Sequence, residues 1–588
     1  MKKIISSVII GFLIIGGLGA VAFDNSDHIT KIKEIIHISQ PVIKDSDKYV
    51  NIDFEESDSY ICNPGKPLLP TVTRIFTFPL GTKIVDVDVR CEYEEYVLSK
   101  KIHPAPRPKI ISKEVSQELH EVVPDEKIYA SLELYPSEPY ILSRGAGLQD
   151  GNHVLFLNVK VAPQYSPLLN LLLFPQEIEI TVEYQLPEEP LFTADEYDMV
   201  IIAPSQFSST LQPLIDHKLK YGMRTFLKTT NEIYDEYEGR DQAEQIKYFI
   251  KDAIETFGIF YVLLMGNIDL VPIRLAAIQI DVVELKEVPT DLYYADLYDD
   301  NGSFSSWDSN NNDIFSELIY DANTGKMQYI DLLDLYSDVG VGRLPCNNMF
   351  EVKIVVNKIM YYESKTYGQE WFNKLILMGG DTTPESGLCE GEIVTEQIAQ
   401  LMPAFQHIKL WTSKNTFSPF LINQEINKGA GFVSYSGHGY EYGIGTFSQG
   451  GENFIKYFTP YLIGLHNNKL PIIFIDACLT SRLDFTIGDI KLPCFAWSIV
   501  KKLFGGAIAS IGATRVASEG IIGNNIIDGC VLLHVKFFNA YNSSIFLSQM
   551  LMKAQNEYLN TVTWYKDYLT LEEFILVGDP SLKVGGYE

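Results

Sequence analysis

Two short apolar runs, each ending in a reactive side chain, constrain the fold of this 588-residue chain more than any other feature. The first is Gly431–Gly439 (GFVSYSGHG), which carries His438, and the second is Pro471–Cys478 (PIIFIDAC). A helix-length stretch between them, Phe454–Asn468, predicts a strand, a crossover helix and a second, parallel strand. Since parallel strands end at the same sheet edge, where open α/β folds form their sites, we expect His438 to face Cys478.

This pairing is what a cysteine nucleophile and its histidine base require. We expect His438 to take the thiol proton, Cys478 to attack an acyl carbon, and the N–H groups of Gly439 and Cys478 to hold the oxyanion. Asp381, just after the predicted strand Lys374–Met378, is the carboxylate expected to orient the imidazole. Each residue alone also has a structural explanation: an inert buried thiol, a histidine in a glycine-rich turn, and a capping aspartate. Their joint position favours a Cys–His dyad.

The second half of the chain alternates buried strands with helices. Runs such as Met199–Ala203 and Phe260–Met265 flank helical stretches such as Ala243–Thr256, which predicts βαβ units and a parallel sheet. A break near Lys365–Glu370 divides this α/β region into two predicted subdomains, residues 197–366 and 370–588.

The preceding residues, 24–190, have a different pattern. Short alternating runs such as Val154–Val161 (VLFLNVKV) and Ile178–Tyr184 (IEITVEY) are separated by Pro and Gly, which predicts an all-β domain. The acidic, Pro-containing segment Leu186–Glu196 is the expected linker to the α/β region.

The N-terminus predicts export. Two lysines precede an uncharged run, Ile4–Phe23, and Ala20-Val21-Ala22 fits a signal-peptidase site, so residues 1–22 form a signal peptide or, if uncut, a membrane anchor. The protein is then secreted or held at the cell surface, with membrane contact only through that segment. A net charge of −29 argues against nucleic-acid binding. Seven cysteines leave at least one free thiol, and a Cys62–Cys91 disulfide is left open.

Asp476 precedes Cys478 by two positions, so on a strand the two side chains point the same way. Asp476 is therefore expected to line the substrate pocket, together with Ser436; the alternative for Asp476 is a buried carboxylate bonded to backbone donors.

These blocks resemble the gingipain family of cysteine peptidases in the caspase-like clan. The resemblance covers most of residues 198–580 and includes motifs PTDLYY, VGRLP, GGAIAS and GDPSL, while HPAPRP and PQYSP resemble that family's propeptide. It implies a caspase-like α/β catalytic domain of two subdomains, an all-β prodomain and an endopeptidase made as a zymogen. The catalytic pair falls on Cys478 and His438, and the acidic residue that orients the histidine on Asp381. Glu392 matches the acid that binds the P1 side chain in arginine-specific members, and Asp476 resembles the clostripain family, which cuts after basic residues.

An Asn/Asp-rich loop raises a metal hypothesis. Asp308, Asn310 and Asn312 supply oxygens at alternate positions, as in calcium loops, but Ile319 stands where an EF-hand has its bidentate Glu. A structural calcium and a solvated loop are both compatible with this pattern, and the chemistry itself requires no cofactor. Two other functions remain open for the whole chain: a non-catalytic surface protein for binding or assembly, and a thiol transpeptidase. Protein or peptide substrates are expected if it is an enzyme.

Overall fold

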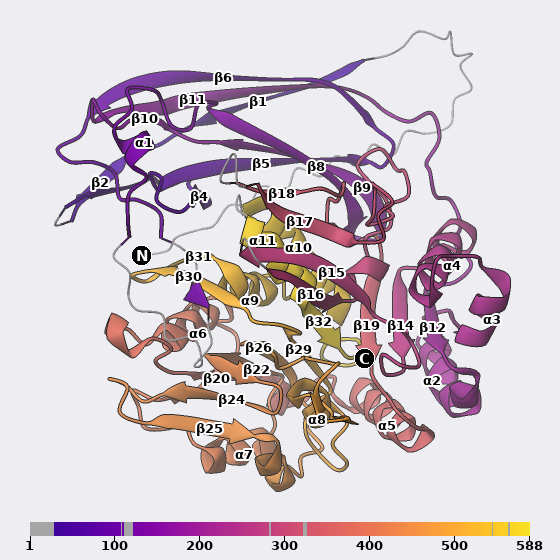
Figure 1. Ribbon diagram of the computed structural model, residues 1–588. Coiled ribbons are helices and arrows are strands. Elements are labelled where there is room, and N and C mark those ends of the chain that lie inside the picture. The colour runs from indigo at the N-terminus through magenta and orange to yellow at the C-terminus, as the bar shows by residue number, and fades with distance from the viewer. Residues whose placement is uncertain are drawn as a thin grey trace.

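The computed structural model describes residues 29–46, 48–106, 109–110, 122–281, 284–321, 326–543, 545–561 and 565–588. The predicted signal peptide, residues 1–22, lies outside them. Within the described ranges, no helix is long and apolar enough to cross a membrane. Figure 1 shows a strand-rich N-terminal domain lying across one side of a larger α/β domain, as the sequence predicts.

The N-terminal domain is built from two antiparallel sheets. One has the order β1-β11-β10, with β6 also paired to β11, and the other has the order β4-β5-β9-β8. Apolar side chains of both sheets, such as Ile180 and Leu157, meet in one core between them. The domain contains the strands β1 (Thr30–His37), β2 (Val42–Asp45), β3 (Val50–Asp53), β4 (Ser59–Ile61), β5 (Leu69–Pro79), β6 (Lys83–Val97), β7 (Lys109–Ile110), β8 (Tyr140–Gln149), β9 (Asn152–Val161), β10 (Gln164–Ser166) and β11 (Leu171–Gln185), and the short helix α1 (Glu126–Tyr129).

A ten-stranded sheet forms the centre of the α/β domain. Its order is β13-β12-β14-β19-β32-β29-β26-β22-β20-β21. All neighbours are parallel except β29 and β32, which are antiparallel. The strands are β12 (Met199–Ala203), β13 (Thr225–Thr229), β14 (Tyr261–Met265), β19 (Gly340–Leu344), β20 (Lys374–Gly379), β21 (Gln406–Trp411), β22 (Phe432–Ser436), β26 (Ile472–Asp476), β29 (Ala509–Ala513) and β32 (Phe574–Val577). The sheet is therefore continuous, and the last strand in sequence lies between its two halves.

Helices cover this sheet and begin at residues that satisfy their first N–H groups. Asp241 caps α4, Asn348 caps α5 and Asp528 caps α9, each with a side-chain oxygen that accepts from the first turn. The α/β domain contains α2 (Ser208–Lys220), α3 (Thr230–Glu236), α4 (Gln242–Phe257), α5 (Met349–Lys365), α6 (Glu390–Leu401), α7 (Pro419–Lys428), α8 (Phe495–Val500), α9 (Gly529–Asn539), α10 (Leu547–Thr561) and α11 (Tyr565–Glu573).

The remaining strands form small sheets around the main one. They are β15 (Arg274–Asp281), β16 (Glu284–Thr290), β17 (Phe315–Asp321), β18 (Lys326–Tyr329), β23 (His438–Tyr440), β24 (Gly443–Phe447), β25 (Phe454–Phe458), β27 (Thr486–Ile487), β28 (Ile490–Lys491), β30 (Ser518–Ile522) and β31 (Asn525–Asp528). The strand β7 of the N-terminal domain joins β30 and β31 in one sheet.

The connection between β22 and β26 differs from the expected helix. Residues Phe454–Asn468 form β25 and then a 3-10 helix, Thr459–Gly464. The sequence Phe-Ile-Lys-Tyr-Phe favours a strand because it is rich in aromatic and β-branched residues, and Pro460 ends it. Glycines on β24 leave room for the aromatic rings of β25, since a Cβ at Gly443 would lie 2.2 Å from Phe458 Cδ1. The predicted parallel pairing of β22 and β26 is nevertheless present.

A buried ion cluster holds the two ends of the α/β domain together. Lys218 of α2 lies 2.8 Å from Glu363 of α5 and 2.7 Å from Asp579 in the GDPSL turn, and all three side chains are fully buried. The two carboxylates raise the pKa of Lys218 against the effect of burial, so the lysine keeps its charge.

Candidate active site

The predicted reactive residues follow neighbouring strands at one edge of the sheet. Ser436 at the end of β22 is paired with Asp476 at the end of β26, and also with Gly379 at the end of β20. Asp381, His438 and Cys478 each come two residues beyond these positions. The structure therefore brings the three residues to one place, as expected for parallel strands that end at the same edge of a sheet.

Gly439, the residue after His438, lies against the backbone of Cys478. A Cβ built on Gly439 would lie 2.2 Å from the carbonyl oxygen of Cys478 and 2.9 Å from its backbone nitrogen. Only glycine permits this approach. Both reactive side chains are buried, with 4% of His438 and 1% of Cys478 exposed. The backbones of Gly439 and Cys478, whose N–H groups are the predicted oxyanion donors, are thus in direct contact.

The imidazole of His438 is oriented by a main-chain carbonyl. Its Nε2 lies 2.9 Å from the oxygen of Thr382, and because a carbonyl only accepts, Nε2 carries the proton and Nδ1 is the basic nitrogen. Thr382 is held in turn, since its N–H donates to Glu390 (3.1 Å) and its hydroxyl to Glu519 (3.2 Å). Sequence reasoning could not find Thr382, because a backbone acceptor leaves no trace in residue type.

Asp381, the predicted orienting carboxylate, lies next to that carbonyl. It is buried, and its Oδ1 has no hydrogen-bond partner within the described residues. Burial, and then the charge of Glu390, raise the pKa of Asp381 to about 6. The contact to His438 Nε2 comes from the main-chain oxygen of Thr382, and the role of Asp381 in orienting the imidazole stays a prediction.

The sulfur of Cys478 is covered by the chain that follows β29. Its Sγ accepts a hydrogen bond from Ala517 N–H at 3.2 Å. Burial, followed by the charge of Glu573, raises the pKa of Cys478 well above its usual range, so the thiol is protonated in this state. The next residues begin β30, where Ser518 and Glu519 are paired with Ile110 and Lys109 of β7. A strand of the N-terminal domain therefore borders the segment that covers the nucleophile.

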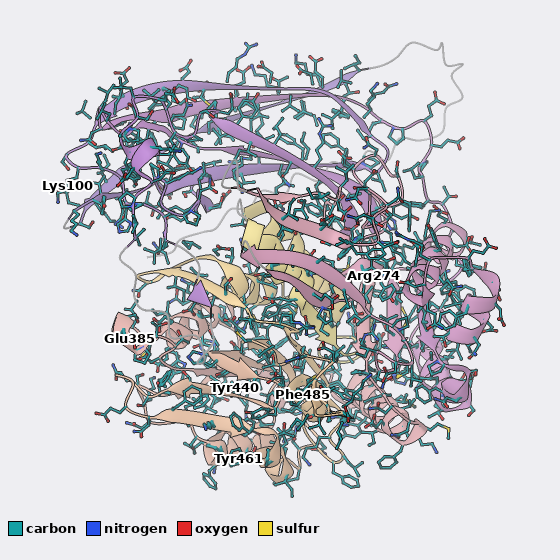
Figure 2. All side chains as sticks on the ribbon, in the orientation of Figure 1. Lys100, Arg274, Glu385, Tyr440, Tyr461 and Phe485 are labelled. Carbon is teal, nitrogen blue, oxygen red and sulfur yellow. The ribbon has the colours of Figure 1, made fainter. Side chains whose placement is uncertain are left out.

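Aromatic rings line the strands beside the histidine. The His438 ring lies 5.7 Å from Phe454, and Tyr440 stacks at 6.0 Å on Tyr442, which is 6.4 Å from Phe485. Figure 2 labels Tyr440 and Phe485 in the α/β domain.

The three predicted substrate-binding residues are buried and polar. Ser436 donates its hydroxyl proton to Asp476 Oδ2 at 2.8 Å, and His534 Nδ1 lies 3.5 Å from the same oxygen. Asp476 Oδ1 has no hydrogen-bond partner within the described residues. Glu392 accepts from the Ser413 N–H (2.9 Å), the Ser413 hydroxyl (2.5 Å) and Thr412 (3.2 Å), so its two oxygens already have donors.

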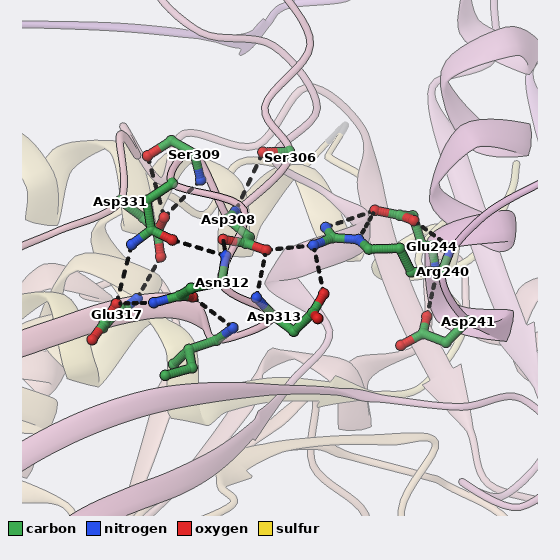
Figure 3. Close-up of polar contacts among 12 residues, drawn as sticks. Arg240, Asp241, Glu244, Ser306, Asp308, Ser309, Asn312, Asp313, Glu317 and Asp331 are labelled. Carbon is green, nitrogen blue, oxygen red and sulfur yellow. Dashed lines mark hydrogen bonds and ion pairs between the residues drawn. The ribbon is translucent and has the colours of Figure 1, made fainter.

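The Asn/Asp-rich loop closes on an arginine rather than presenting ligands to an ion. Figure 3 shows the guanidinium of Arg240 against the carboxylate of Asp308, which also accepts from the N–H groups of Asn312 and Asp313 at 3.0 Å. Asn310 Oδ1 accepts from Asn312 N–H as well. Among the described residues there is no group of three acidic, His or Cys side chains placed to hold a metal. As folded, these residues do not fit calcium, which would have to displace Arg240.

The chain thus has a caspase-like α/β domain with a cysteine and a histidine at the carboxyl edge of its sheet. Residues 192–585 match the model of Peptidase family C25, and residues 35–205 match the model Propeptide_C25. The chain therefore belongs to peptidase family C25 and carries its propeptide domain.

Individual relatives are distant. The chain is 24% identical to gingipain R2 of Porphyromonas gingivalis over 309 residues, which is 52% of this chain and 34% of that protein. It is equally similar to gingipain R1 of the same species, where the match covers 25% of the relative. The match thus spans about a third of gingipain R2 and a quarter of this gingipain R1.

Two solved structures match about two thirds of this chain. The complex of P. gingivalis RgpB pro- and mature domains has 20% identity and a TM-score of 0.48, over 66% of this chain and 79% of that chain. The Arg specific cysteine proteinase gingipain R (RgpB) has 20% identity and a TM-score of 0.47, over 67% and 80%. The family assignment rests on the sequence match over residues 192–585.

Proposed function

We propose that this protein is an exported cysteine endopeptidase, made as a zymogen, that cleaves polypeptides after Arg or Lys. The observation that carries the proposal is the close contact between the backbone of Gly439, the residue after His438, and Cys478. A Cβ on Gly439 would lie 2.2 Å from the carbonyl oxygen of Cys478. Membership of peptidase family C25 supports the reaction class. The predicted signal peptide supports export.

The chemistry follows from the two side chains. Nδ1 of His438 takes the thiol proton, and the thiolate of Cys478 adds to the scissile carbonyl carbon. The N–H groups of Gly439 and Cys478 stabilise the oxyanion. When the intermediate collapses, the C–N bond breaks and the imidazolium gives its proton to the leaving amine. Water, activated by the same imidazole, then hydrolyses the thioester and frees Cys478.

Latency is supported by the contacts around the thiol. The segment Ala517–Glu519 bonds the sulfur at Ala517 and pairs with β7 of the N-terminal domain at Ser518 and Glu519. A substrate can reach Cys478 only when this segment moves, and β7 holds it in place. Cutting the linker Leu186–Glu196 releases the N-terminal domain and, with it, β7.

Preference for basic P1 residues is supported by the acidic surroundings of the nucleophile. Asp476, two residues from Cys478, is fully buried and has one oxygen without a hydrogen-bond partner within the described residues. A positively charged substrate group would neutralise it. Glu392, the residue that matches the P1-binding acid by family resemblance, would have to exchange its bonds to Thr412 and Ser413 for the substrate.

The test uses the full-length protein with a recognition site for an unrelated protease placed within Leu186–Glu196. We expect little activity before the linker is cut, and cleavage of a positional peptide library after Arg or Lys once it is cut. Equal activity of the cut and uncut forms would refute latency. Cleavage after Asp, Asn or large apolar residues would refute the proposed specificity, and ligation of peptides in place of hydrolysis would indicate a transpeptidase.

A further inference from the structure

Glu573 is a second buried acid at the catalytic edge of the sheet. It ends α11 and directly precedes β32. Because β32 runs antiparallel to β29, its beginning lies where β29 and β26 end, and Phe574 is paired with Ala513. The carbonyl of Glu573 accepts from the N–H of Thr514 at 2.8 Å. The residue therefore reaches the nucleophile's edge of the sheet from a distant part of the chain.

A single segment links Glu573 to the nucleophile. Residues 513–517, which begin beside Glu573, also bond the loop that carries Cys478. The N–H of Leu479 donates to Arg515 O at 2.9 Å, and the N–H of Ala517 donates to Cys478 Sγ at 3.2 Å. After burial, Glu573 in its ionised form contributes most to raising the pKa of Cys478, ahead of Asp476. Glu573 thus lies close enough to the Cys478 thiol to affect the pKa of that thiol.

The carboxyl of Glu573 is only partly hydrogen-bonded within the described residues. The side chain is 1% exposed, and within the described residues its Oε2 has no hydrogen-bond partner. Burial, and then the neighbouring Glu572, raise its pKa well above the usual range, although Arg515 opposes this, so the carboxyl is neutral in the closed state. Glu392 differs, because Thr412 and Ser413 satisfy both its oxygens.

Asp476 offers a matching oxygen across β29. It is fully buried, and its Oδ1 has no hydrogen-bond partner within the described residues. Burial lowers the pKa of His534 against the effect of Asp476, so this imidazole is neutral and does not cancel the charge. The thiol of Cys530 also lies beside Asp476, and burial and that charge raise its pKa. β26 and β32 flank β29, so the two acids are separated by two strand spacings, roughly 10 Å between backbones.

We propose that Glu573 and Asp476 together form the base of the P1 pocket, and that Glu573 is a specificity-determining residue that receives the guanidinium or ammonium group of the substrate. This inference rests on the proposed cleavage after Arg or Lys. A guanidinium between the two acids can donate to both orphan oxygens, which converts two unsatisfied buried groups into charge-assisted hydrogen bonds. As the cation enters, Glu573 gives up its proton to solvent, so the pocket becomes a paired ionic site only when it is filled.

The test compares peptides that differ only in P1 Arg or citrulline, a neutral group of the same shape, using the full chain activated at its linker. In Glu573→Gln we expect the Arg-to-citrulline ratio of kcat/KM to fall about a hundredfold, with citrulline turnover and labelling of Cys478 by iodoacetamide retained. Glu572→Gln is the matched control. Glu572 is equally buried and also has one oxygen, Oε2, without a hydrogen-bond partner within the described residues. Its Oε1, however, accepts from Ser316, and Glu572 is not among the groups that shift the pKa of Cys478, so the ratio should stay within about threefold of wild type.

A measurement on the unchanged enzyme guards against loss of folding in the variant. Agmatine, a free guanidinium compound, should bind with net release of protons at pH 6, measured by calorimetry in buffers of different ionisation enthalpy. Wild-type preference for Arg that persists in Glu573→Gln, or agmatine binding without proton release, would overturn the role of Glu573 and leave the proposed function standing. Absence of any preference for Arg in the wild type would overturn both.

Discussion

Replacement of Gly439 by alanine should disable the site without unfolding the protein. The added Cβ would lie 2.2 Å from the carbonyl oxygen of Cys478, whereas real Cβ contacts essentially never fall under 3.0 Å. The loop of Cys478 and the strand of His438 must therefore separate by about 1 Å, and a misplacement of that size costs about a hundredfold in rate. We expect kcat/KM to fall by at least that factor.

The assay is hydrolysis of a peptide substrate by the activated enzyme, with the thermal midpoint followed in parallel. The control is Gly464→Ala, since a Cβ at Gly464 meets only the flexible side chain of Asn423, with Nδ2 at 2.5 Å. Gly464→Ala should retain near-normal activity. If Gly439→Ala also retained it, the close approach of Gly439 to Cys478 would not be part of the active geometry.

Two further predictions concern buried charges. Lys218→Met leaves Glu363 and Asp579 buried without their cation, and should destabilise the protein by about 3–5 kcal/mol in urea denaturation; a loss below about 1 kcal/mol would contradict the ion cluster. Asp381 has its pKa raised to about 6, by burial and then by Glu390, so its favourable contribution to folding is full at low pH and is lost as pH rises through about 6. Asp381→Asn should therefore raise the thermal midpoint at pH 8 and have a shrinking effect towards pH 4, whereas a difference independent of pH would refute this assignment.

The sequence was sufficient to predict the paired strands that carry the proposed dyad. The runs Phe432–Ser436 and Ile472–Asp476 are apolar along their whole length, as strands buried on both faces of a parallel sheet must be. Their ends then fix where His438 and Cys478 lie, whatever connects them. The prediction of a helix between them was wrong. A short stretch such as Phe454–Asn468 is not long enough for its hydrophobic periodicity to distinguish a helix from a strand.

The surroundings of the dyad could not be predicted from local pattern. Thr382 acts through its main-chain oxygen, which every residue has, so nothing in its side chain marks it. Glu573 is far from Cys478 in sequence and meets the site only because β32 inserts between β19 and β29. The pairing of β7 with β30 likewise joins two domains, and the sequence patterns of each domain alone do not predict a contact between them.

The most direct test of the central claim is the activity of Cys478→Ala after its linker is cut. The nucleophile supplies the only covalent route in the proposed mechanism, and a small change at this buried strand end, where Cys478 is 1% exposed, leaves the fold in place. We predict complete loss of peptide hydrolysis with an unchanged thermal midpoint. Activity above a few per cent of wild type in this folded variant would contradict the assignment of Cys478 as the nucleophile.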